Sequence, residues 1–380
     1  MSEALRFPPV ELPHEAEALR AEVRRFLEDQ RAAQKFAPSY EGWGGFSPEF
    51  SRAMGERGWI GRSWPVAYGG QNRPPIERYV ITEETLAAGA PVRAHWVADR
   101  QSGPTILRFG TEAQKRTYLP RIARGECFFC IGMSEPDSGS DLASIRTRAR
   151  KIDGGWEIEG AKIWTSNAHR CHMMILFART SPRGEDRHAG VSQFLVDLAA
   201  PGITIRPIMN LADEHDFNEV VFDRAFVADD QVIGEIGNGW NQVTSELAYE
   251  RSGPERWLSS YGVLRGLIDA LGPAPGAKEA EALGRLVAHI ATLRRMSISV
   301  AGMLQQGAAP NVEAALVKDL GTTFEQEIPA VARRLVPQGQ RAPEFAAVLD
   351  RTMLWAPAFS IRGGTREVLR GIIARALGLR

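Results

Sequence analysis

The chain has 380 residues, 44% hydrophobic and 24% charged, which is the composition of a globular protein with two or three packed domains. Its 46 basic and 46 acidic side chains cancel, so there is no overall attraction to nucleic acid or to an anionic membrane. The apolar runs, such as 173–178, are far shorter than the roughly 20 residues that cross a bilayer, and the N-terminus lacks a secretory pattern. We therefore expect a cytoplasmic protein.

The first predicted elements are helices. Segment 15–29 is rich in Ala, Leu, Glu and Arg and lacks Gly and Pro, and segments 74–88 and 112–123 are similar. Segment 58–70 is dense in glycine and aromatic residues, so we expect it to form a structured loop.

Short β-type runs follow from about residue 126, separated by turn residues. The expected strands are 156–159, 173–178, 192–196, 203–205 and 219–222. From about residue 239 the helical period returns. Apolar side chains share a face at Leu264, Leu267, Ile268 and Leu271, within 283–293, and within 368–373.

The order of helices, strands and helices predicts an α+β fold. Strands that follow one another without helices between them favour an antiparallel sheet or barrel over βαβ units. We predict an N-terminal helical domain (1–125), a central antiparallel β-barrel-like domain (126–235) and a C-terminal helical bundle (236–380).

The three cysteines are too few for a disulfide framework. The pair Cys127-x-x-Cys130 lacks the second ligand pair of a zinc site, so packing is favoured over redox or metal chemistry. The cluster His169, Cys171 and His172 has no supporting ligand group, and we predict no metal site.

Two neighbouring segments of the β region are unusual together. Segment 131–141 (IGMSEPDSGSD) places hydroxyls and glycines after a β-like run, where backbone N–H groups and serines can crowd one polar ligand. About 20 residues later, segment 159–167 (EGAKIWTSN) sets a tryptophan beside two hydroxyls. Each alone is typical of a turn-rich strand connection.

With three further segments, these two make the chain resemble the acyl-CoA dehydrogenase family of flavoproteins from about residue 15 to 380. The supporting segments are WPVAYGGQ (64–71), FGTEAQKRTYLP (109–120), SEPDSGSD (134–141), GAKIWTSN (160–167) and Gly364-Thr365 before the last helix. The family has an N-terminal helical domain, a β domain and a C-terminal four-helix bundle, which agrees with the division above.

The resemblance implies FAD as cofactor and acyl-CoA as substrate. It assigns the flavin pyrimidine to Met133 and Ser134, isoalloxazine packing to Trp164, and the neighbourhood of flavin N5 to Ser166. Ser140 matches a serine at the pyrophosphate and pantetheine end, where it also serves substrate binding. Thr365 matches a residue at the FAD pyrophosphate, a role suited to the positive end of a helix dipole.

The implied reaction removes the proton α to a thioester and transfers the β-hydride to flavin N5, so it needs a carboxylate base and fixed donors for the enolate oxygen. In many members the base directly precedes the Gly-Thr of the last helix, but Gly363 stands there. A minority carry it before an arginine on the first helix of the bundle, which here gives Glu250 followed by Arg251. The alternatives are a solvent-exposed Glu250 and the competing carboxylate Glu246.

By the same resemblance, the Gly363 N–H donates to the thioester carbonyl, and we place Arg251 at the substrate. Arg362 stands where many relatives have an aromatic or small residue, and we expect it to point to solvent rather than to an acidic acyl group. Gly253-Pro254 should interrupt or kink the helix that carries Glu250.

Partners are less constrained by the sequence. The family implies electron-transferring flavoprotein as acceptor and a homodimer or homotetramer. An Arg-x-x-Phe-Gly segment is replaced around 279–286 and a Gly-Gly-x-Gly segment at 335–340. Because both normally hold FAD across a subunit interface, a hetero-oligomer is open. The alternative functions are an acyl-CoA oxidase or flavin monooxygenase of the same fold, or a non-catalytic subunit of a hetero-oligomeric dehydrogenase.

Overall fold

A computed structural model describes residues 5–38, 44–245 and 251–379. The chain separates into two compact units. The first contains Met1–Phe46, Pro74–Val92 and Leu247–Arg380, and the second contains Ser47–Arg73 and Arg93–Glu246. The first unit thus joins helices from both ends of the chain. The three-domain division at residues 125 and 235 stays a prediction.

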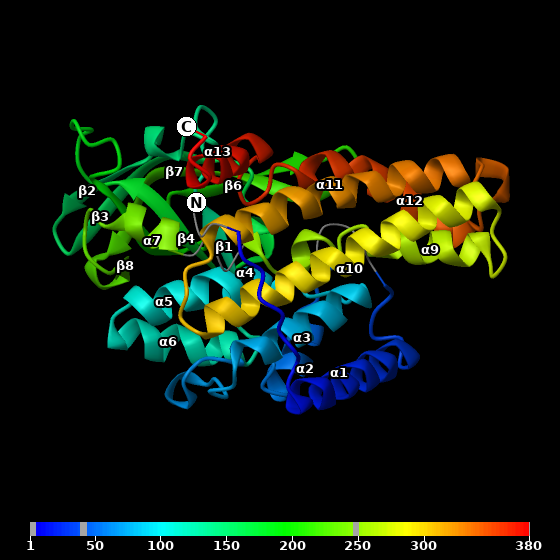
Figure 1. The fold of residues 1–380 in the computed structure, drawn as a ribbon. Helices are drawn as coiled ribbons and strands as arrows, with labels where there is room; N and C mark the ends of the chain where they lie inside the picture. Colours follow the sequence, from blue (N-terminus) through cyan, green and yellow to red (C-terminus); the bar gives the residue numbers. More distant parts are fainter. Residues whose placement is uncertain (1–4, 39–43, 246–250, 380) are drawn as a thin grey trace. The chain divides into compact units, whose positions relative to one another are not determined.

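The second unit contains the β-sheet, drawn mainly in green in Figure 1. Its strands are β1 (Phe129–Gly132), β2 (Arg148–Ile152), β3 (Gly155–Lys162), β4 (Met173–Arg179), β5 (Val191–Asp197), β6 (Ile203–Met209), β7 (His215–Ala228) and β8 (Val232–Ile233). Their order is β6-β7-β3-β2-β4-β5-β8, with β1 also paired to β4. All five expected strands are present.

The sheet is mixed rather than wholly antiparallel, which corrects the predicted β arrangement. β1 pairs with β4 in parallel, and β2 meets β4 in parallel at Arg148 and Arg179. Parallel strands need a long crossover, which is usually a helix. Here the β2–β3 hairpin lies between β1 and β4 in the sequence, so the absence of helices did not exclude parallel pairing.

The core of the sheet is centred on β4 and β5, because every residue of each except the last is buried. Trp156 of β3 meets Phe194 of β5 edge to face at 5.6 Å between ring centroids, and both belong to the apolar cluster of the sheet. Cys130 is buried in the same cluster and Cys171 packs against it. These cysteines therefore serve packing.

Short helices complete the second unit. They are α2 (Pro48–Glu56), α4 (Arg93–Val97), the π-helical turn η2 (Ala98–Ser102), α5 (Gly103–Phe109), α6 (Glu112–Ala123) and α7 (Gly239–Ser245), with single turns at η1 (Val66–Tyr68), η3 (Leu142–Ser144), η4 (Ala168–Arg170) and η5 (Asp229–Gln231). A capping box between Thr111 and Gln114 starts α6, because each side chain satisfies an N–H of the first turn. The Gln114 amide also donates to the Val232 carbonyl at 2.8 Å, which ties α6 to β8.

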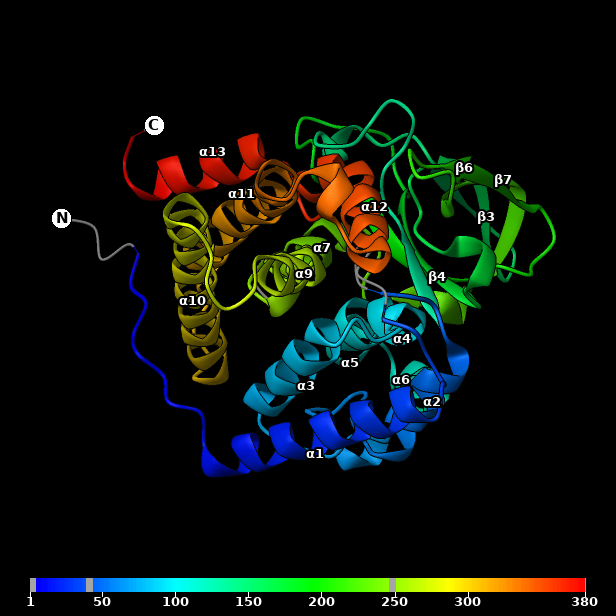
Figure 2. The same cartoon turned by 90° about the vertical axis from the view of Figure 1, so that its right-hand side faces the viewer.

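The first unit is helical. Its elements are α1 (His14–Ala32), α3 (Pro75–Ala87), η6 (Pro254–Arg256), α9 (Tyr261–Leu271), α10 (Ala277–Gln305), α11 (Asn311–Leu335), η7 (Gln338–Gln340), α12 (Pro343–Phe359) and α13 (Arg366–Ala376). α11 contacts α9, α10, α12 and α13, and α9 also contacts α12, so α9 to α12 form a bundle (Figure 2). α1 packs on α3, and α3 packs on α10.

The predicted apolar faces of the bundle are confirmed in their centres and not at their edges. Leu264 and Leu267 are buried in α9, whereas Ile268 is 41% exposed. Arg251 is helical, residues 252 and 253 form a bend, and the 3-10 turn η6 begins at Pro254, so helical structure is interrupted at Gly253-Pro254 as expected.

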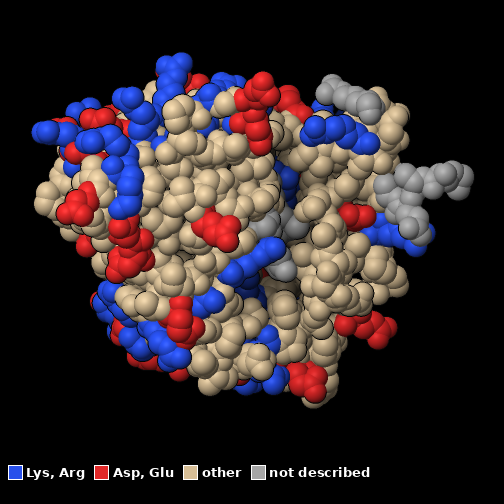
Figure 3. Space-filling model, turned by 90° about the vertical axis from the view of Figure 1, so that its left-hand side faces the viewer, with Lys and Arg blue, Asp and Glu red and all other residues tan. Residues whose placement is uncertain are grey.

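Two surface properties follow from the composition. Basic and acidic side chains are interspersed over the face drawn in Figure 3, in keeping with the zero net charge. None of the helices in the described ranges is both long enough and apolar enough to cross a bilayer.

Candidate functional site

The segment after β1 carries Met133 and Ser134 and is fixed to the end of β3. The Lys162 ammonium donates to the Met133 carbonyl at 3.0 Å, and the Ile163 N–H donates to the Ser134 carbonyl at 2.9 Å. Both predicted residues are half-buried. The backbone of Met133 and Ser134 is therefore held at a fixed position, while these two residues stay partly accessible.

A buried ion pair supports this segment. Lys162 is 0% exposed and donates to a Glu135 oxygen at 2.8 Å, while Glu135 also accepts the backbone N–H groups of Arg146 (2.6 Å) and Thr147 (2.9 Å). Burial lowers the pKa of Lys162 to about 8, against the opposing effect of Glu135. Burial by itself would raise the Glu135 pKa, but the charge and hydrogen bond of Lys162 lower it overall. Both groups are thus charged at neutral pH.

Trp164 occupies an unusual position directly after β3. Its φ is +59°, it is 57% exposed, and it meets the Phe217 ring edge-on at 5.9 Å between centroids. A bulky side chain rarely adopts a left-handed φ, and such strain costs about 1–3 kcal/mol and concentrates at functional sites. The backbone therefore holds one face of an indole in the open.

The neighbouring hydroxyls differ in their surroundings. Thr165 is 1% exposed, and its Oγ1 has no hydrogen-bond partner among the residues that the structure describes. Ser166 is half-buried. An orphaned buried hydroxyl beside an exposed indole suits a planar ligand with polar edges, so the residues present fit a flavin ring.

The turn that contains Ser140 is organised by Ser138. Glu135 and Ser138 exchange backbone hydrogen bonds at 2.8 and 3.0 Å, and Ser138 Oγ donates to the Asp141 carbonyl at 2.6 Å. Ser140 itself is exposed. Met133, Ser134, Ser140, Trp164 and Ser166 all lie in the second unit.

The remaining predicted residues that the structure describes, Arg251, Gly363 and Thr365, lie in the first unit around the start of α13. Gly363 and Gly364 have φ values of +69° and +95°, which glycine adopts without strain. The Arg251 guanidinium donates to the Gly363 carbonyl at 3.3 Å, and the buried Lys318 ammonium donates to the Gly364 carbonyl at 2.6 Å. Thr365 then caps α13 by accepting the Val368 N–H at 3.4 Å.

The contacts of Arg251 and Lys318 involve the carbonyls of Gly363 and Gly364 and leave the N–H of Gly363 available. It donates to no other residue in the described ranges. A fixed left-handed glycine that offers its N–H is a suitable donor to a developing oxyanion. Glu250, the predicted base, and Glu246, its competitor, lie outside the described residues.

Arg362 does not point to solvent, and that prediction was wrong. Its guanidinium donates to a Glu325 oxygen at 2.8 Å, and the Glu325 side chain is 0% exposed. The guanidinium also lies 4.7 Å from the ring centroid of Phe359. Burial lowers the pKa of Arg362, with Glu325 opposing that effect. The arginine holds α11 to the segment before α13.

His169 and His172 of the cluster considered above contact different residues. His169 stacks on His215 at 3.7 Å between ring centroids, and both rings contact Asn218 Oδ1. The ring nitrogen Nδ1 of His172 instead accepts the Phe128 N–H at 3.1 Å.

Three supporting residues were missed by the sequence reasoning: Glu135, Lys162 and Lys318. The first two lie inside the quoted family segments, where the ligand-facing serines and tryptophan drew attention. A lysine at the end of an otherwise apolar strand, about 27 positions from a glutamate in a Gly/Ser-rich turn, is too common a pattern to identify a pair.

The comparisons with known proteins agree with these features. Models of the acyl-CoA dehydrogenase N-terminal, middle and C-terminal domains match residues 13–126, 130–225 and 237–378. The chain belongs to the acyl-CoA dehydrogenase family. This membership makes it an FAD-dependent oxidoreductase.

Relatives with curated descriptions carry the same family name. Acyl-CoA dehydrogenase IpdE1 of Mycobacterium tuberculosis is 34% identical over 96% of this chain and 98% of the relative. Acyl-CoA dehydrogenase FadE34 of the same organism is 35% identical over 87% of this chain. This acyl-CoA dehydrogenase chain spans about half of FadE34, since the match covers 46% of that relative.

Solved structures share the fold. The Tcur3481-Tcur3483 steroid ACAD is 28% identical, with a TM-score of 0.85 over 97% of this chain and 98% of that one. The ChsE4-ChsE5 complex from Mycobacterium tuberculosis is also 28% identical, with a TM-score of 0.81 over 98% of this chain and 100% of that one.

Proposed function

We propose that this acyl-CoA dehydrogenase converts an acyl-CoA to the 2,3-enoyl-CoA with Glu250 as the base. The Glu250 carboxylate takes the proton from the carbon α to the thioester. FAD, when bound, supplies the acceptor for the hydride from the β carbon. The electron pair left by the α proton forms the new C=C bond.

The contact between Arg251 and Gly363 is the observation that carries the proposal. Arg251 directly follows Glu250 in the chain, and its guanidinium holds the carbonyl of the glycine whose N–H is available to the thioester oxygen. The proposed base and oxyanion donor are thereby linked through one fixed side chain. Arg251 acts in substrate binding by holding this donor in place.

The decisive experiment compares Glu250→Gln with Glu246→Gln. We expect Glu250→Gln to retain FAD and to lose anaerobic flavin bleaching by acyl-CoA by about 100-fold or more, the usual size of general-base catalysis. Glu246→Gln should bleach normally. Normal bleaching in Glu250→Gln, or its loss in Glu246→Gln alone, would reject the assignment.

The substrate class that we propose is a steroid-derived acyl-CoA. The 28% identical neighbour over nearly the whole chain is described as a steroid ACAD, which supports this choice. A panel of straight, branched, aromatic, dicarboxylic and steroid-derived acyl-CoAs tests it by flavin bleaching. Faster bleaching by a straight-chain ester than by every steroid-derived ester would reject it.

We propose electron-transferring flavoprotein as the electron acceptor and assembly with a second chain. The ChsE4-ChsE5 complex supports a two-component assembly, and the replaced segments 279–286 and 335–340 leave the usual subunit contacts to FAD unfilled. Mass measurement of the purified enzyme tests the assembly. Rapid reoxidation of the reduced flavin by oxygen would favour an oxidase instead.

A further inference from the structure

The loop between β3 and η4 has an unusual backbone. We name its residues 163–167 the indole loop, because Trp164 is among them. Trp164 and Asn167 both adopt a left-handed φ, at +59° and +55°. Asparagine tolerates that conformation, but a bulky side chain rarely adopts it. Surrounding contacts therefore have to hold the indole in place.

Asn218 of β7 holds the residue at the centre of the indole loop. Its carbonyl accepts the Thr165 N–H at 3.0 Å, and its side-chain amide donates to the Thr165 carbonyl at 2.9 Å. Asn218 is 0% exposed, so water does not compete for either bond. Both polar backbone groups of Thr165 are thus bound to Asn218. The two predicted flavin-contacting residues, Trp164 and Ser166, are the neighbours of Thr165 in the chain.

Two stacked imidazoles fix the orientation of the Asn218 amide. Asn218 Oδ1 lies 3.1 Å from His169 Nδ1 and 2.7 Å from His215 Nε2, and the two rings are 3.7 Å apart between centroids. The Thr165 carbonyl can only accept, so the amide nitrogen faces it and Oδ1 faces the rings. Each ring therefore donates to Oδ1. Burial lowers the pKa of His169 to about 4, with the charges of His215 and Arg170 acting in the same direction, so this ring is neutral at pH 7.

We infer that Asn218 is a positioning residue of the flavin site, which holds the indole of Trp164 in the orientation that its predicted flavin contact requires. The paired register of β3 and β7 ends at Lys162 and Val220. The Asn218 side chain extends that connection to a loop whose left-handed residues do not continue the ladder. Without its amide, the Thr165 carbonyl would lose this buried donor. The inference rests on the proposed FAD-dependent reaction and on the predicted contact of Trp164 with the flavin.

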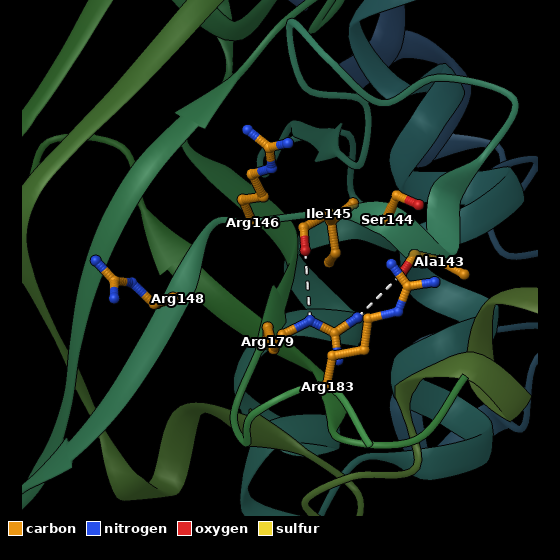
Figure 4. Close-up of a pocket in the computed structure, with 7 residues that line it drawn as sticks. All are labelled: Ala143, Ser144, Ile145, Arg146, Arg148, Arg179 and Arg183. Carbon is orange, nitrogen blue, oxygen red and sulfur yellow. Dashed lines mark hydrogen bonds between the residues drawn. The ribbon is translucent and has the colours of Figure 1, made fainter. Parts of the chain in front are cut away.

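The network of Asn218 and the two imidazoles is separate from an arginine-lined cavity in the same unit. Figure 4 shows that cavity, which is lined by residues 143–146 and by Arg148, Arg179 and Arg183. None of these lining residues belongs to the indole loop or to the network. A substitution of Asn218 therefore replaces no residue of the cavity, and its effect on the flavin can be attributed to the loop.

The experiment compares Asn218→Asp with Asn210→Asp at pH 8, where an aspartate is ionised and cannot donate. At both positions Oδ1 accepts two N–H groups, because Asn210 Oδ1 accepts those of Ala212 (2.8 Å) and Glu214 (3.1 Å). The Asn210 amide nitrogen has no partner among the residues that the structure describes, so the control loses no hydrogen bond. Asn218→Ser brings no charge into the buried site and gives the same comparison if Asn218→Asp does not fold.

The first readout is amide hydrogen exchange in the apoprotein, which does not depend on the flavin. We expect the amides of the indole loop to exchange about tenfold faster in Asn218→Asp, the factor of one lost hydrogen bond, and at the wild-type rate in Asn210→Asp. Exchange in the buried strand β4 should be unchanged in both variants. Wild-type exchange of the indole loop in Asn218→Asp, or equal acceleration of the loop and β4, would overturn the inference.

The second readout is the fluorescence of bound FAD, because a stacked indole quenches an excited flavin. We expect Asn218→Asp and Trp164→Ala each to raise the fluorescence per bound FAD, and the double variant to match Trp164→Ala alone, since Asn218 acts through the indole. A further rise in the double variant, or unchanged fluorescence in Trp164→Ala, would overturn the inference. Because neither readout involves turnover, absence of bleaching by every acyl-CoA alongside the expected patterns would reject the proposed reaction and leave the inference standing.

Discussion

The buried pair between Lys162 and Glu135 predicts a large loss of stability from Lys162→Met. The substitution keeps most of the side-chain volume but leaves the Glu135 carboxylate, 6% exposed, without its cation. Removing one partner of a buried pair costs about 3–5 kcal/mol. Because Glu135 keeps two backbone N–H donors, we expect the lower end of that range, about 3 kcal/mol. The Met133 carbonyl also loses the Lys162 ammonium as its donor, which costs about 1 kcal/mol more.

The chain offers a matched control in Lys151→Met. Lys151 and Asp229 are also 2.8 Å apart, but both side chains are 51% exposed. An exposed pair contributes at most about 1 kcal/mol. The two variants therefore share the substitution and the distance between charges, and differ in burial.

The assay is calorimetric unfolding at pH 7, below the Lys162 pKa of about 8, with excess FAD in every sample. A loss of about 4 kcal/mol corresponds to a decrease in Tm of roughly 8–16 °C in a domain of this size class, whereas the control should lose no more than about 4 °C. We also expect weaker FAD binding in Lys162→Met, because the Met133–Ser134 segment loses an anchor. Equal decreases in Tm for the two variants would refute the argument from burial.

Three other outcomes are expected. Trp164→Ala should weaken FAD binding by about tenfold in a flavin fluorescence titration with little change in the Tm of the apoprotein, since the indole is 57% exposed. Glu325→Gln should lower the free energy of unfolding by about 3–5 kcal/mol, because it leaves the Arg362 guanidinium without its buried partner. Glu327→Gln removes a half-buried partner of the exposed Arg285 and should cost at most about 1 kcal/mol. His95 has a pKa of about 4 because of burial, against 6.5 in the unfolded chain, so its neutral form adds about 3 kcal/mol of stability above pH 6.5 that is lost as the pH falls to 4. Urea titrations across that range should show a shallower acid loss in His95→Gln.

The secondary structure was predictable where the sequence has a clear hydrophobic pattern or a clear signal for the end of an element. Segment 112–123 is a helix with those bounds, and its start is fixed by the capping box between the N-cap Thr111 and Gln114 in the first turn. The strand 173–178 was predicted from an unbroken apolar run, which is typical of a strand buried on both faces. Its parallel pairing with β1 was not predictable, because strand direction depends on a crossover that periodicity does not reveal.

The sequence suggests candidate site residues but does not reveal the residues that support them. Met133, Ser134 and Trp164 were named from family segments and lie on one unit, while their roles toward a flavin stay predictions. The left-handed φ of Trp164 has no signature in the residues around it. The orphaned Thr165 hydroxyl likewise appears only when burial is known. Local sequence proposes which groups meet a ligand, whereas the contacts that orient those groups come from residues distant in the chain.

Arg362 shows why charge is the hardest property to place. Its neighbours in sequence are a hydrophobe and two glycines, which favour an exposed turn. The side chain turns inward because Glu325, 37 residues earlier, is fully buried and needs a cation.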